Sequence, residues 1–502
     1  MTPLDIKKDS KLKSGMNLMI VQFALYFIPL ITIPYVVKTV GIENYGKYVF
    51  FQAVMGLLGV IINWGFIQTG VRDISVCKTL DEINREYSHI LYSKLLALFI
   101  ACAIGSALFL FGMFRAEWEL YSLSFLALPV IFLDTAFLYQ GIEKLKDFVN
   151  ISLAGNLCVL ALLFLTVREE GDYRLLPMVF SAPRILAYLF SIYFLHYRFR
   201  IVPNAFSLSG VYEKLRSNFS IFATNISAIL YTRATQVILG VAAGTEFVGY
   251  YAVADQLVFA YSNIQGKIST VYQPQIAQAF KDDFNEAVVK ARENTCMIFL
   301  AAMAGFLFTQ FFAPEILYFL FKDRAAGSVH VLRILSVNFV TMHLSYIMAM
   351  QILLSLHREW EILKPSIYAA ILNLTLGSAL IYFFRHTGAA LSVALIEVII
   401  CVYFYLKVKG YGIDVLDRKM LMTLLNFVVS LLFILSGLKF LYVITDVSVY
   451  VKFPLVTVFY ALSILLALKA LNIIDFKKRK LLIGQVAIND QVESEDTRAE
   501  RP

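Results

Sequence analysis

The sequence predicts an all-α, polytopic membrane protein of about 14 transmembrane helices, arranged as two six-helix repeats followed by an additional helix pair. Two observations lead to this fold class. First, 59% of the 502 residues are hydrophobic and 16% are charged, with a mean hydropathy of +0.71, which exceeds what a soluble core requires. Second, a twelve-residue segment occurs twice, and the apolar runs around it repeat in number and direction.

The duplicated segment reads GIENYGKYVFFQ at positions 41–52 and GTEFVGYYAVAD at positions 244–255. In both places it lies between two long apolar runs. Four positions coincide: Gly41 with Gly244, Glu43 with Glu246, Gly46 with Gly249 and Tyr48 with Tyr251. This spacing predicts an internal duplication of a membrane protein.

A membrane-spanning helix needs about 20 mainly apolar residues to cross roughly 30 Å of hydrocarbon. The predicted spans lie near 15–37, 47–66, 90–113, 120–140, 149–167, 177–195, 217–240, 247–270, 294–313, 329–353, 365–384, 388–406, 420–442 and 454–471. They predict an N-terminal lobe over 1–205, a C-terminal lobe over 206–410, the additional helix pair within 411–475 and a cytoplasmic tail over 476–502. Because each repeat holds an even number of spans, both copies run in the same direction, and the two lobes are expected to enclose a central cavity.

Lysine and arginine residues predict the orientation. The net charge is +8, and most basic residues fall in short connections and tails on one side of the predicted membrane. The positive-inside rule therefore places both termini in the cytoplasm, and nucleic acid is not expected as a partner. The first apolar run lacks a cleavage site and is expected to be a retained span, whereas the final stretch, QVESEDTRAERP, predicts a disordered tail.

Several stretches resemble one family of transporters: PYVVKTVGIENYGKYVFFQAV, WGFIQTGVRDIS, YYAVADQL and GAALSVALIE. Together with the duplication, they resemble the polysaccharide-export flippases, the Wzx-type oligosaccharide-lipid flippases of the multidrug/oligosaccharidyl-lipid/polysaccharide exporter superfamily. This resemblance implies alternating-access translocation of an undecaprenyl-diphosphate-linked oligosaccharide across the bacterial plasma membrane, for the synthesis of O-antigen, capsule or exopolysaccharide. It also implies membrane lipids, a polysaccharide polymerase and a chain-length regulator as partners.

The sequence leaves other functions open. A drug or cation antiporter of the same superfamily usually stops at twelve spans, so the pair after residue 420 argues against it. A lipid II flippase is poorly separated by sequence. A membrane-embedded glycan polymerase normally works through a sizeable outer loop, whereas the longest predicted outer connection, about 314–328, is short. No cofactor and no enzymatic activity are expected, because the chain contains no hydrolase signature and positions 41–48 lack the hydroxyl that completes a phosphate-binding loop.

Ionisable residues inside apolar spans are the candidate functional residues, because each is costly in hydrocarbon and must face protein or water. The predicted substrate-binding residues are Arg184, Arg233, Gln236 and Arg333. An arginine suits a diphosphate, because its guanidinium is permanently charged and offers forked donors. The alternative role for each arginine is to neutralise a buried acid and fix the helices.

The predicted ion-coupling residues are Asp134, Asp255 and Glu397, since a buried carboxylate can take up and release a proton. Glu397 shares its helix face with Ala390, Ala394 and Cys401, a pattern that equally fits helix packing. His343 is more often a hydrogen-bonded core residue than a proton carrier. On the sixth predicted span, Ser181, Arg184, Tyr188 and Ser191 form a polar stripe that is expected to face the bundle interior.

Overall fold

The computed structural model describes residues 28–445, 447–471, 474–475 and 480–481. It divides into two compact units, Met1–Ala252 and Val253–Pro502. Residues 15–27 of the first predicted span and most of the predicted tail lie outside the described residues. The predicted division into lobes, with boundaries at 205 and 410, is based on the internal repeat and stays a prediction.

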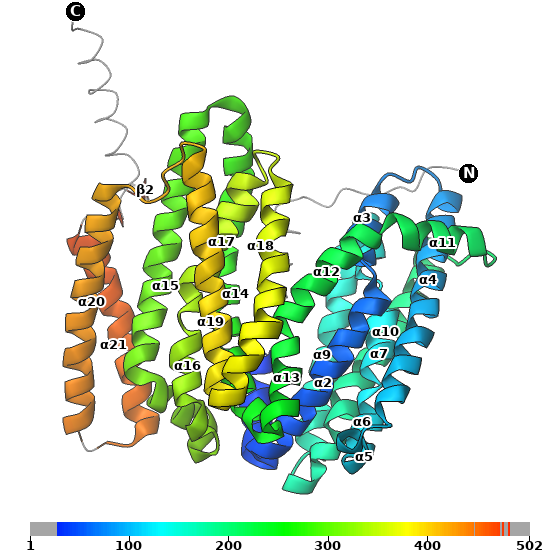
Figure 1. Cartoon of the computed structure of the whole chain (residues 1–502), viewed down its shortest axis with the longest axis horizontal. Coiled ribbons are helices and arrows are strands. Elements are labelled where there is room, and N and C mark those ends of the chain that lie inside the picture. The colour runs from blue at the N-terminus through cyan, green and yellow to red at the C-terminus, as the bar shows by residue number, and fades with distance from the viewer. Residues whose placement is uncertain (1–27, 446, 472–473, 476–479, 482–502) are drawn as a thin grey trace, which may run out of the picture. The chain divides into compact units, whose positions relative to one another are not determined.

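Unit 1 is built from helices, drawn from blue to green in Figure 1. In chain order they are a helix over Ile28–Val40, α2 (Ile42–Asn63), α3 (Phe66–Ser75), α4 (Leu80–Leu108), α5 (Gly112–Ala116), α6 (Trp118–Ser124), α7 (Ala127–Leu133), α8 (Ala136–Gly141), α9 (Leu145–Thr166), the 3-10 helix η1 (Glu170–Leu175), α10 (Leu176–Phe199), α11 (Leu208–Ser217), α12 (Phe219–Thr232) and α13 (Ala234–Ala243). Helix α14 (Thr245–Asp282) continues from unit 1 into unit 2.

Unit 2 is also helical, with one very small hairpin near its end. Its elements are α15 (Phe284–Phe321), the 3-10 helix η2 (Lys322–Ser328), α16 (Val329–Leu335), α17 (Asn338–Tyr346), the π-helix η3 (Ile347–Leu353), α18 (Glu359–Leu372), the π-helix η4 (Asn373–Gly377), α19 (Ser378–Gly410), α20 (Arg418–Ile444), α21 (Val449–Ala470), β1 (Ile474–Asp475) and β2 (Lys480–Leu481). The two strands pair antiparallel.

Local sequence explains where several of these helices begin. Helix α4 starts with a capping box, in which the Thr79 hydroxyl accepts from the Glu82 amide at 3.3 Å and the Glu82 carboxylate accepts from the Thr79 amide at 3.4 Å. Helix α15 starts with Asp283, whose carboxylate accepts from the amides of Asn285 and Glu286. These polar residues satisfy amide groups that have no partner within the helix.

Among the described residues, nine helical stretches are long and apolar enough to cross a membrane, and two shorter apolar helices accompany them. The nine stretches are Ile42–Ser75, Leu80–Leu108, Trp118–Gly141, Leu145–Thr166, Glu170–Phe199, Phe284–Leu335, Glu359–Gly410, Met420–Ile444 and Val449–Ala470. Two of them contain 52 residues, which as a straight helix is about 78 Å, more than twice the hydrocarbon thickness. The all-α, polytopic membrane fold is therefore confirmed, while the number of 14 spans stays a prediction.

The two copies of the duplicated segment share an unusual backbone conformation. Gly41, before α2, has φ 84° and ψ 163°, and Gly244, before α14, has φ 109° and ψ 160°. This region of backbone space is essentially restricted to glycine. The sequence keeps glycine at both positions because each copy makes the same turn into a long helix.

The copies also contact each other within unit 1. A Cβ atom placed on Gly46 would lie 1.9 Å from the carbonyl oxygen of Thr245, and one placed on Gly249 would lie 2.3 Å from the carbonyl oxygen of Ile42. Such distances are far below a normal van der Waals contact, so only glycine fits at either position. The motif glycines thus allow the start of α2 and the start of α14 to pack backbone against backbone.

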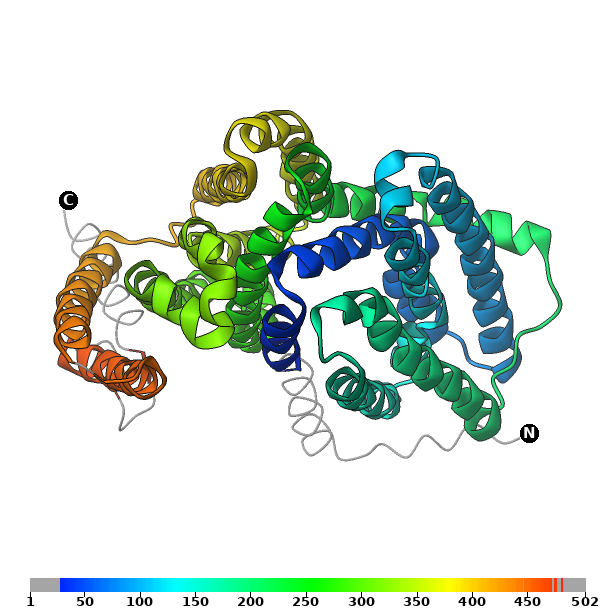
Figure 2. The ribbon, with the colours of Figure 1, turned by 90° about the horizontal axis from the view of Figure 1, so that it is seen from below.

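The C-terminal pair α20 and α21 lies side by side against α15 (Figure 1 and Figure 2). Large apolar side chains fill this contact, including the fully buried Phe312, Phe427 and Leu431. The Tyr460 hydroxyl on α21 donates to the carbonyl of Ala304 on α15 at 2.9 Å. The pair is therefore an integral part of unit 2.

Candidate functional site

The predicted fourth span is interrupted at Asp134, one of the candidate ion-coupling residues. Helix α7 ends there, because Asp134 adopts an extended conformation with ψ 111°, and α8 begins two residues later. The Asp134 carboxylate accepts from the amide of Ala136 at 2.9 Å, and its backbone carbonyl accepts from the Lys94 ammonium at 2.9 Å. A helix break inside a membrane frees backbone groups, and these two bonds satisfy them.

Lys94, on α4, is a functional candidate that the sequence analysis missed. It lies within the predicted span 90–113, and its side chain is only 3% exposed. The sequence does indicate Lys94, because a lysine four residues into an apolar run is costly in hydrocarbon unless it has a partner. The sequence does not reveal that partner, because the carbonyl of Asp134 lies 40 positions away.

Arg184, on α10, pairs with a side chain of the neighbouring helix α9. Asn156 Oδ1 accepts from Arg184 Nε at 3.2 Å and from Nη2 at 2.9 Å. Two bonds to one oxygen fix the plane of the guanidinium, while Nη1 is not part of this pair. A neutral amide therefore positions Arg184, and its positive charge is not cancelled by this contact.

The polar stripe of α10 faces the interior of unit 1. Ser181 and Ser191 are buried, and Tyr188 stacks on Phe148 with ring centroids 5.5 Å apart. Ser191 joins α10 to the start of α8, because its hydroxyl pairs with Thr135 at 3.1 Å and its carbonyl accepts from Tyr139 at 2.8 Å. The helix break at Asp134 and the Arg184 helix are thus fixed to each other by buried hydrogen bonds.

The other two substrate-binding candidates of unit 1 differ in exposure. Arg233 lies at the junction of α12 and α13 and its side chain is exposed, whereas Gln236 is buried on α13. The carbonyl of Arg233 accepts from the Gln236 amide at 3.2 Å.

Three candidates belong to unit 2. Asp255 on α14 and Arg333 on α16 are half-buried, and Glu397 on α19 is buried. Gln310 of α15 donates to the Arg333 carbonyl at 2.8 Å and to the Ser336 hydroxyl at 2.9 Å. Within the part of the chain that the structure describes, Arg333 Nε is buried without a hydrogen-bond acceptor. The roles of Asp255, Arg333 and Glu397 stay predictions.

Unit 2 contains a buried network of neutral amides that the sequence analysis did not find. Asn294 on α15 donates to Gln351 in η3 at 2.7 Å, and Gln351 donates to the Ser269 carbonyl on α14 at 2.9 Å. His343 bonds to the Ser262 carbonyl at 2.9 Å, which agrees with its interpretation as a core residue. π-Helical segments such as η3 often occur at functional sites. Isolated amides in apolar runs give no pairing signal in a sequence, because their partners lie about 57–82 positions away.

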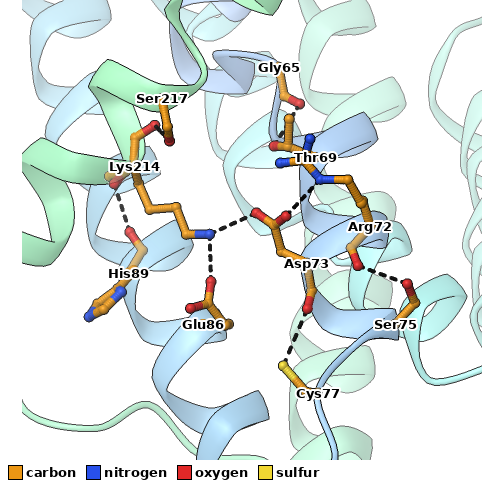
Figure 3. Close-up of polar contacts among 11 residues, drawn as sticks. Gly65, Thr69, Arg72, Asp73, Ser75, Cys77, Glu86, His89, Lys214 and Ser217 are labelled. Carbon is orange, nitrogen blue, oxygen red and sulfur yellow. Dashed lines mark hydrogen bonds and ion pairs between the residues drawn. The ribbon is translucent and has the colours of Figure 1, made fainter.

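Helix α11, which connects α10 to α12, is held by a half-buried ionic cluster (Figure 3). The ammonium of Lys214 lies 2.7 Å from the Asp73 carboxylate and 2.5 Å from the Glu86 carboxylate, and Arg72 also contacts Asp73 at 2.9 Å. Burial disfavours the charged amine, but the two carboxylates outweigh it and raise the pKa of Lys214. The cluster anchors α11 to α3 and α4.

A second ionic cluster lies near the start of α6. Lys47 contacts the Glu117 carboxylate at 2.8 Å, and the Tyr173 hydroxyl donates to the same carboxylate at 2.8 Å. Burial favours the neutral acid, yet these two partners prevail and lower the pKa of Glu117. Lys47 belongs to the first copy of the duplicated segment, so the cluster ties that copy to α6 and η1.

Solved structures share this fold. A lipid II flippase, MurJ, in an inward closed conformation, aligns with a TM-score of 0.71 and 13% identity over 90% of this chain and 97% of that one. A multidrug resistance MATE family transporter of the MOP superfamily, in an inward-facing conformation, aligns with a TM-score of 0.62 and 13% identity over 77% of this chain and 94% of that one. At such low identity the alignments establish the fold alone.

Curated relatives cover most of this chain. A protein of Escherichia coli (strain K12) that carries the name O-antigen transporter is 24% identical over 79% of this chain and 96% of its own length. A protein of Shigella dysenteriae with the same name is 23% identical over 79% of this chain and all of its own length. The names agree with the predicted class, a multi-pass membrane transporter and not an enzyme.

A family model described as polysaccharide biosynthesis protein matches residues 12–280. The match covers more than half of the 502 residues and includes both copies of the duplicated segment, Lys94, Asp134 and Arg184. The chain therefore belongs to the polysaccharide biosynthesis protein family, as its resemblance to the polysaccharide-export flippases predicted.

Proposed function

We propose that this transporter flips an undecaprenyl-diphosphate-linked oligosaccharide from the inner to the outer leaflet of the bacterial plasma membrane, for surface polysaccharide synthesis. Both termini are cytoplasmic in this proposal, in accordance with the distribution of lysine and arginine. The family and the names of the two curated relatives support a role in the export of surface glycans.

The observation that carries the proposal is the Arg184–Asn156 pair. Arg184 is half-buried within a membrane-spanning helix. A cation is energetically costly there, so we expect it to have a function. The partner is a neutral amide, so the pair keeps its positive charge. A fixed, uncancelled guanidinium is suited to an anionic diphosphate, since its planar donors match phosphate oxygens.

An apolar groove elsewhere on these two helices suits the lipid part of the same substrate. The groove runs between α9 and α10 and has a volume of about 740 Å³. Gly155, Cys158, Leu162, Pro183, Leu186 and Phe190 are among its lining residues. Gly155 and Pro183 directly precede Asn156 and Arg184 in sequence. The groove has room for part of a polyprenyl chain, and neither Arg184 nor Asn156 lines it.

We assign ion coupling to Asp134, Asp255 and Glu397 as part of the proposal. Asp134 is the best supported of the three, because it lies at a helix break next to the buried Lys94 ammonium. Broken helices near charged groups are where transporters bind ions.

Reconstitution of the full-length protein tests the substrate. Liposomes containing the wild type are expected to flip a lipid-linked oligosaccharide, while Arg184→Lys retains partial activity and Arg184→Gln nearly none, since Gln supplies no charge. Arg174→Gln is the matched control, because Arg174 forms an exposed pair with Glu119 and lies outside the polar interior. Asn156→Ala is expected to lower activity less than Arg184→Gln, because it loosens the guanidinium without removing it.

The rival functions give different results in the same assay. Efficient flipping of lipid II but not of the lipid-linked oligosaccharide would overturn the proposed substrate in favour of a lipid II flippase. Wild-type activity in Arg184→Gln at equal protein abundance would show that the arginine does not bind the diphosphate. Rescue of Arg184→Gln by neutralising Asp134 would identify the arginine as a structural counter-charge.

A further inference from the structure

Unit 2 contains a largely apolar pocket, with charged residues in its lining, that the proposed translocation does not use. It has a volume of about 380 Å³ and lies where the end of α15, η2, the end of α20 and the start of α21 meet. Its lining includes Glu315, Tyr318, Lys322, Asp323, Tyr442 and Val449. We call it the α15–α20 pocket. Its size is within the range of sites for small ligands.

Two backbone features shape the pocket. Helix α15 contains Pro314, and Phe312 just before it has non-helical angles, φ −118° and ψ 16°. Proline cannot donate the amide bond that continues a helix, so the last turns of α15 change direction and carry Glu315 to the pocket. Lys322 ends α15 with φ 53° and ψ −141°, a conformation that costs free energy for any residue with a side chain. Strain of this kind concentrates at functional sites.

Two lysines contact residues that line the pocket. Lys439 of α20 forms an ion pair with Glu315, and its ammonium lies 4.9 Å from the centre of the Phe312 ring. Lys452 of α21 donates to the carbonyl of Tyr442 at 3.2 Å and lies 4.6 Å from the centre of its ring. Lys439 thus joins α20 to α15, and Lys452 joins α21 to the end of α20.

Two polar atoms in the pocket are buried and unsatisfied. Among the described residues, Glu315 Oε2 and the Tyr442 hydroxyl have no hydrogen-bond partner, although Tyr442 is only 8% exposed. Lys439 bonds to the other carboxylate oxygen, Glu315 Oε1. Buried polar atoms are almost always paired, because an unpaired one forfeits its hydration. Glu315 and Tyr442 both line the pocket, so one ligand placed there lies next to both side chains.

The position of the pocket indicates a ligand from the membrane surface. It lies at the ends of candidate spans, beside the short connection between α20 and α21. Tyr318 and Tyr450 are partly exposed there, with ring centroids 6.5 Å apart. Tyrosine is enriched at the level of lipid headgroups, because its ring is apolar and its hydroxyl is polar.

We propose that the α15–α20 pocket binds the headgroup of an ethanolamine phospholipid. The ligand ammonium donates to Glu315 Oε2, and the ligand phosphate accepts from Lys322 and from the Tyr442 hydroxyl. A primary ammonium supplies N–H donors to a buried carboxylate, which a choline headgroup cannot do because its nitrogen carries only methyl groups. A glycerol headgroup carries no cation, so it offers no ammonium to the Glu315 carboxylate. With the proposed orientation, the pocket belongs to the outer leaflet.

Native mass spectrometry of the full-length protein tests this assignment. The protein in detergent is titrated separately with dioleoyl-phosphatidylethanolamine, -phosphatidylcholine and -phosphatidylglycerol, and the lipid-bound fractions are compared. Wild type is expected to bind the ethanolamine lipid most tightly. Glu315→Gln is expected to weaken that binding about tenfold, and Tyr442→Phe about threefold, because they remove a charged and a neutral hydrogen bond respectively.

A matched control and a second ligand make the result decisive. Glu117→Gln removes a carboxylate of a similar lysine pair in unit 1 and is expected to leave lipid binding unchanged. Tyr442→Phe deletes only a hydroxyl, so it remains informative if Glu315→Gln is unstable. Soluble glycerophosphoethanolamine, added in excess, is expected to compete if the headgroup carries recognition.

Three outcomes would overturn the proposal. They are equal affinity for the three lipids, loss of ethanolamine-lipid binding in Glu117→Gln to the same extent as in Glu315→Gln, and unchanged binding in both pocket variants. The failure of the flippase proposal would not affect these results, because no residue of the assay belongs to the Arg184 site.

Discussion

Replacing Gly46 by alanine tests whether the two copies of the duplicated segment depend on their close contact. The added methyl group would lie 1.9 Å from the carbonyl oxygen of Thr245 and 2.8 Å from the amide nitrogen of Gly249. Both neighbours are backbone atoms, which cannot rotate away as a side chain can. The start of α14 would therefore have to move by about 1.5 Å to reach an ordinary contact distance.

The energetic effect can be isolated with a control in the same helix. Gly56 also lies in α2, and a Cβ atom placed there meets nothing within 4 Å. Alanine stabilises the interior of a helix by about 1 kcal/mol relative to glycine, and both variants share this gain. Overpacking costs about 1–3 kcal/mol, and only Gly46→Ala incurs it. The difference between the two variants is therefore the cost of the clash.

Hydrogen–deuterium exchange of the purified protein measures this cost at both copies. In Gly46→Ala, amides of 41–52 and 244–255 are expected to exchange about 5–150-fold faster than in Gly56→Ala, which corresponds to 1–3 kcal/mol. Flipping activity in liposomes is expected to fall only in Gly46→Ala. Equal exchange of 244–255 in the two variants would refute the close contact between α2 and α14.

Three further changes have expected outcomes. Gly244→Ala meets no neighbouring atom but must keep φ near 109°, so unfolding free energy should fall by about 1–2 kcal/mol; an unchanged melting temperature would contradict the required backbone conformation. Lys94→Met should lower the free energy of unfolding by about 1–3 kcal/mol, because it leaves the Asp134 carbonyl unpaired. Asp134→Asn keeps that carbonyl and should lower it less. Equal melting temperatures of the two variants would argue against this bond. The Glu117 carboxylate, whose pKa is lowered, stabilises the fold above its ordinary pKa of 4.5 and loses this contribution as the pH falls through its lowered value. The gap in melting temperature between wild type and Glu117→Gln should therefore close in acid, and a gap constant from pH 7 to 3 would exclude the Lys47 pair as its cause.

The sequence predicted the fold class and the place of the duplicated turn, because both depend on local patterns. Runs of about 20 apolar residues identify helices that cross a membrane, and conserved spacing within the chain identifies a repeat. Gly41 and Gly244 are identical residues at equivalent positions of the two copies. Their shared backbone conformation is the physical reason for this identity. A backbone requirement of this kind leaves a direct trace in the sequence.

The candidate sites were harder to predict, because their partners are distant in the chain. Arg184 was found as a charge within an apolar run, but its partner Asn156 is an ordinary polar residue in another span. The break at Asp134 was also missed, since no proline or glycine marks positions 134–135 and the helix ends through a side-chain cap and a lysine from α4. Hydropathy alone predicts one continuous span over 120–140.

The two copies of the duplicated segment share what the backbone requires, whereas the polar residues of the two units differ. At Gly46 and Gly249 a single methyl group is excluded by a carbonyl oxygen, so no other residue can replace glycine without moving a helix. A buried hydrogen bond is less restrictive, because many pairs of donors and acceptors can satisfy the same geometry. Unit 1 accordingly fixes a guanidinium with an amide at Arg184, while unit 2 joins its helices through the neutral pair Asn294 and Gln351. The two units can therefore share a turn and still differ in the polar groups of their interiors.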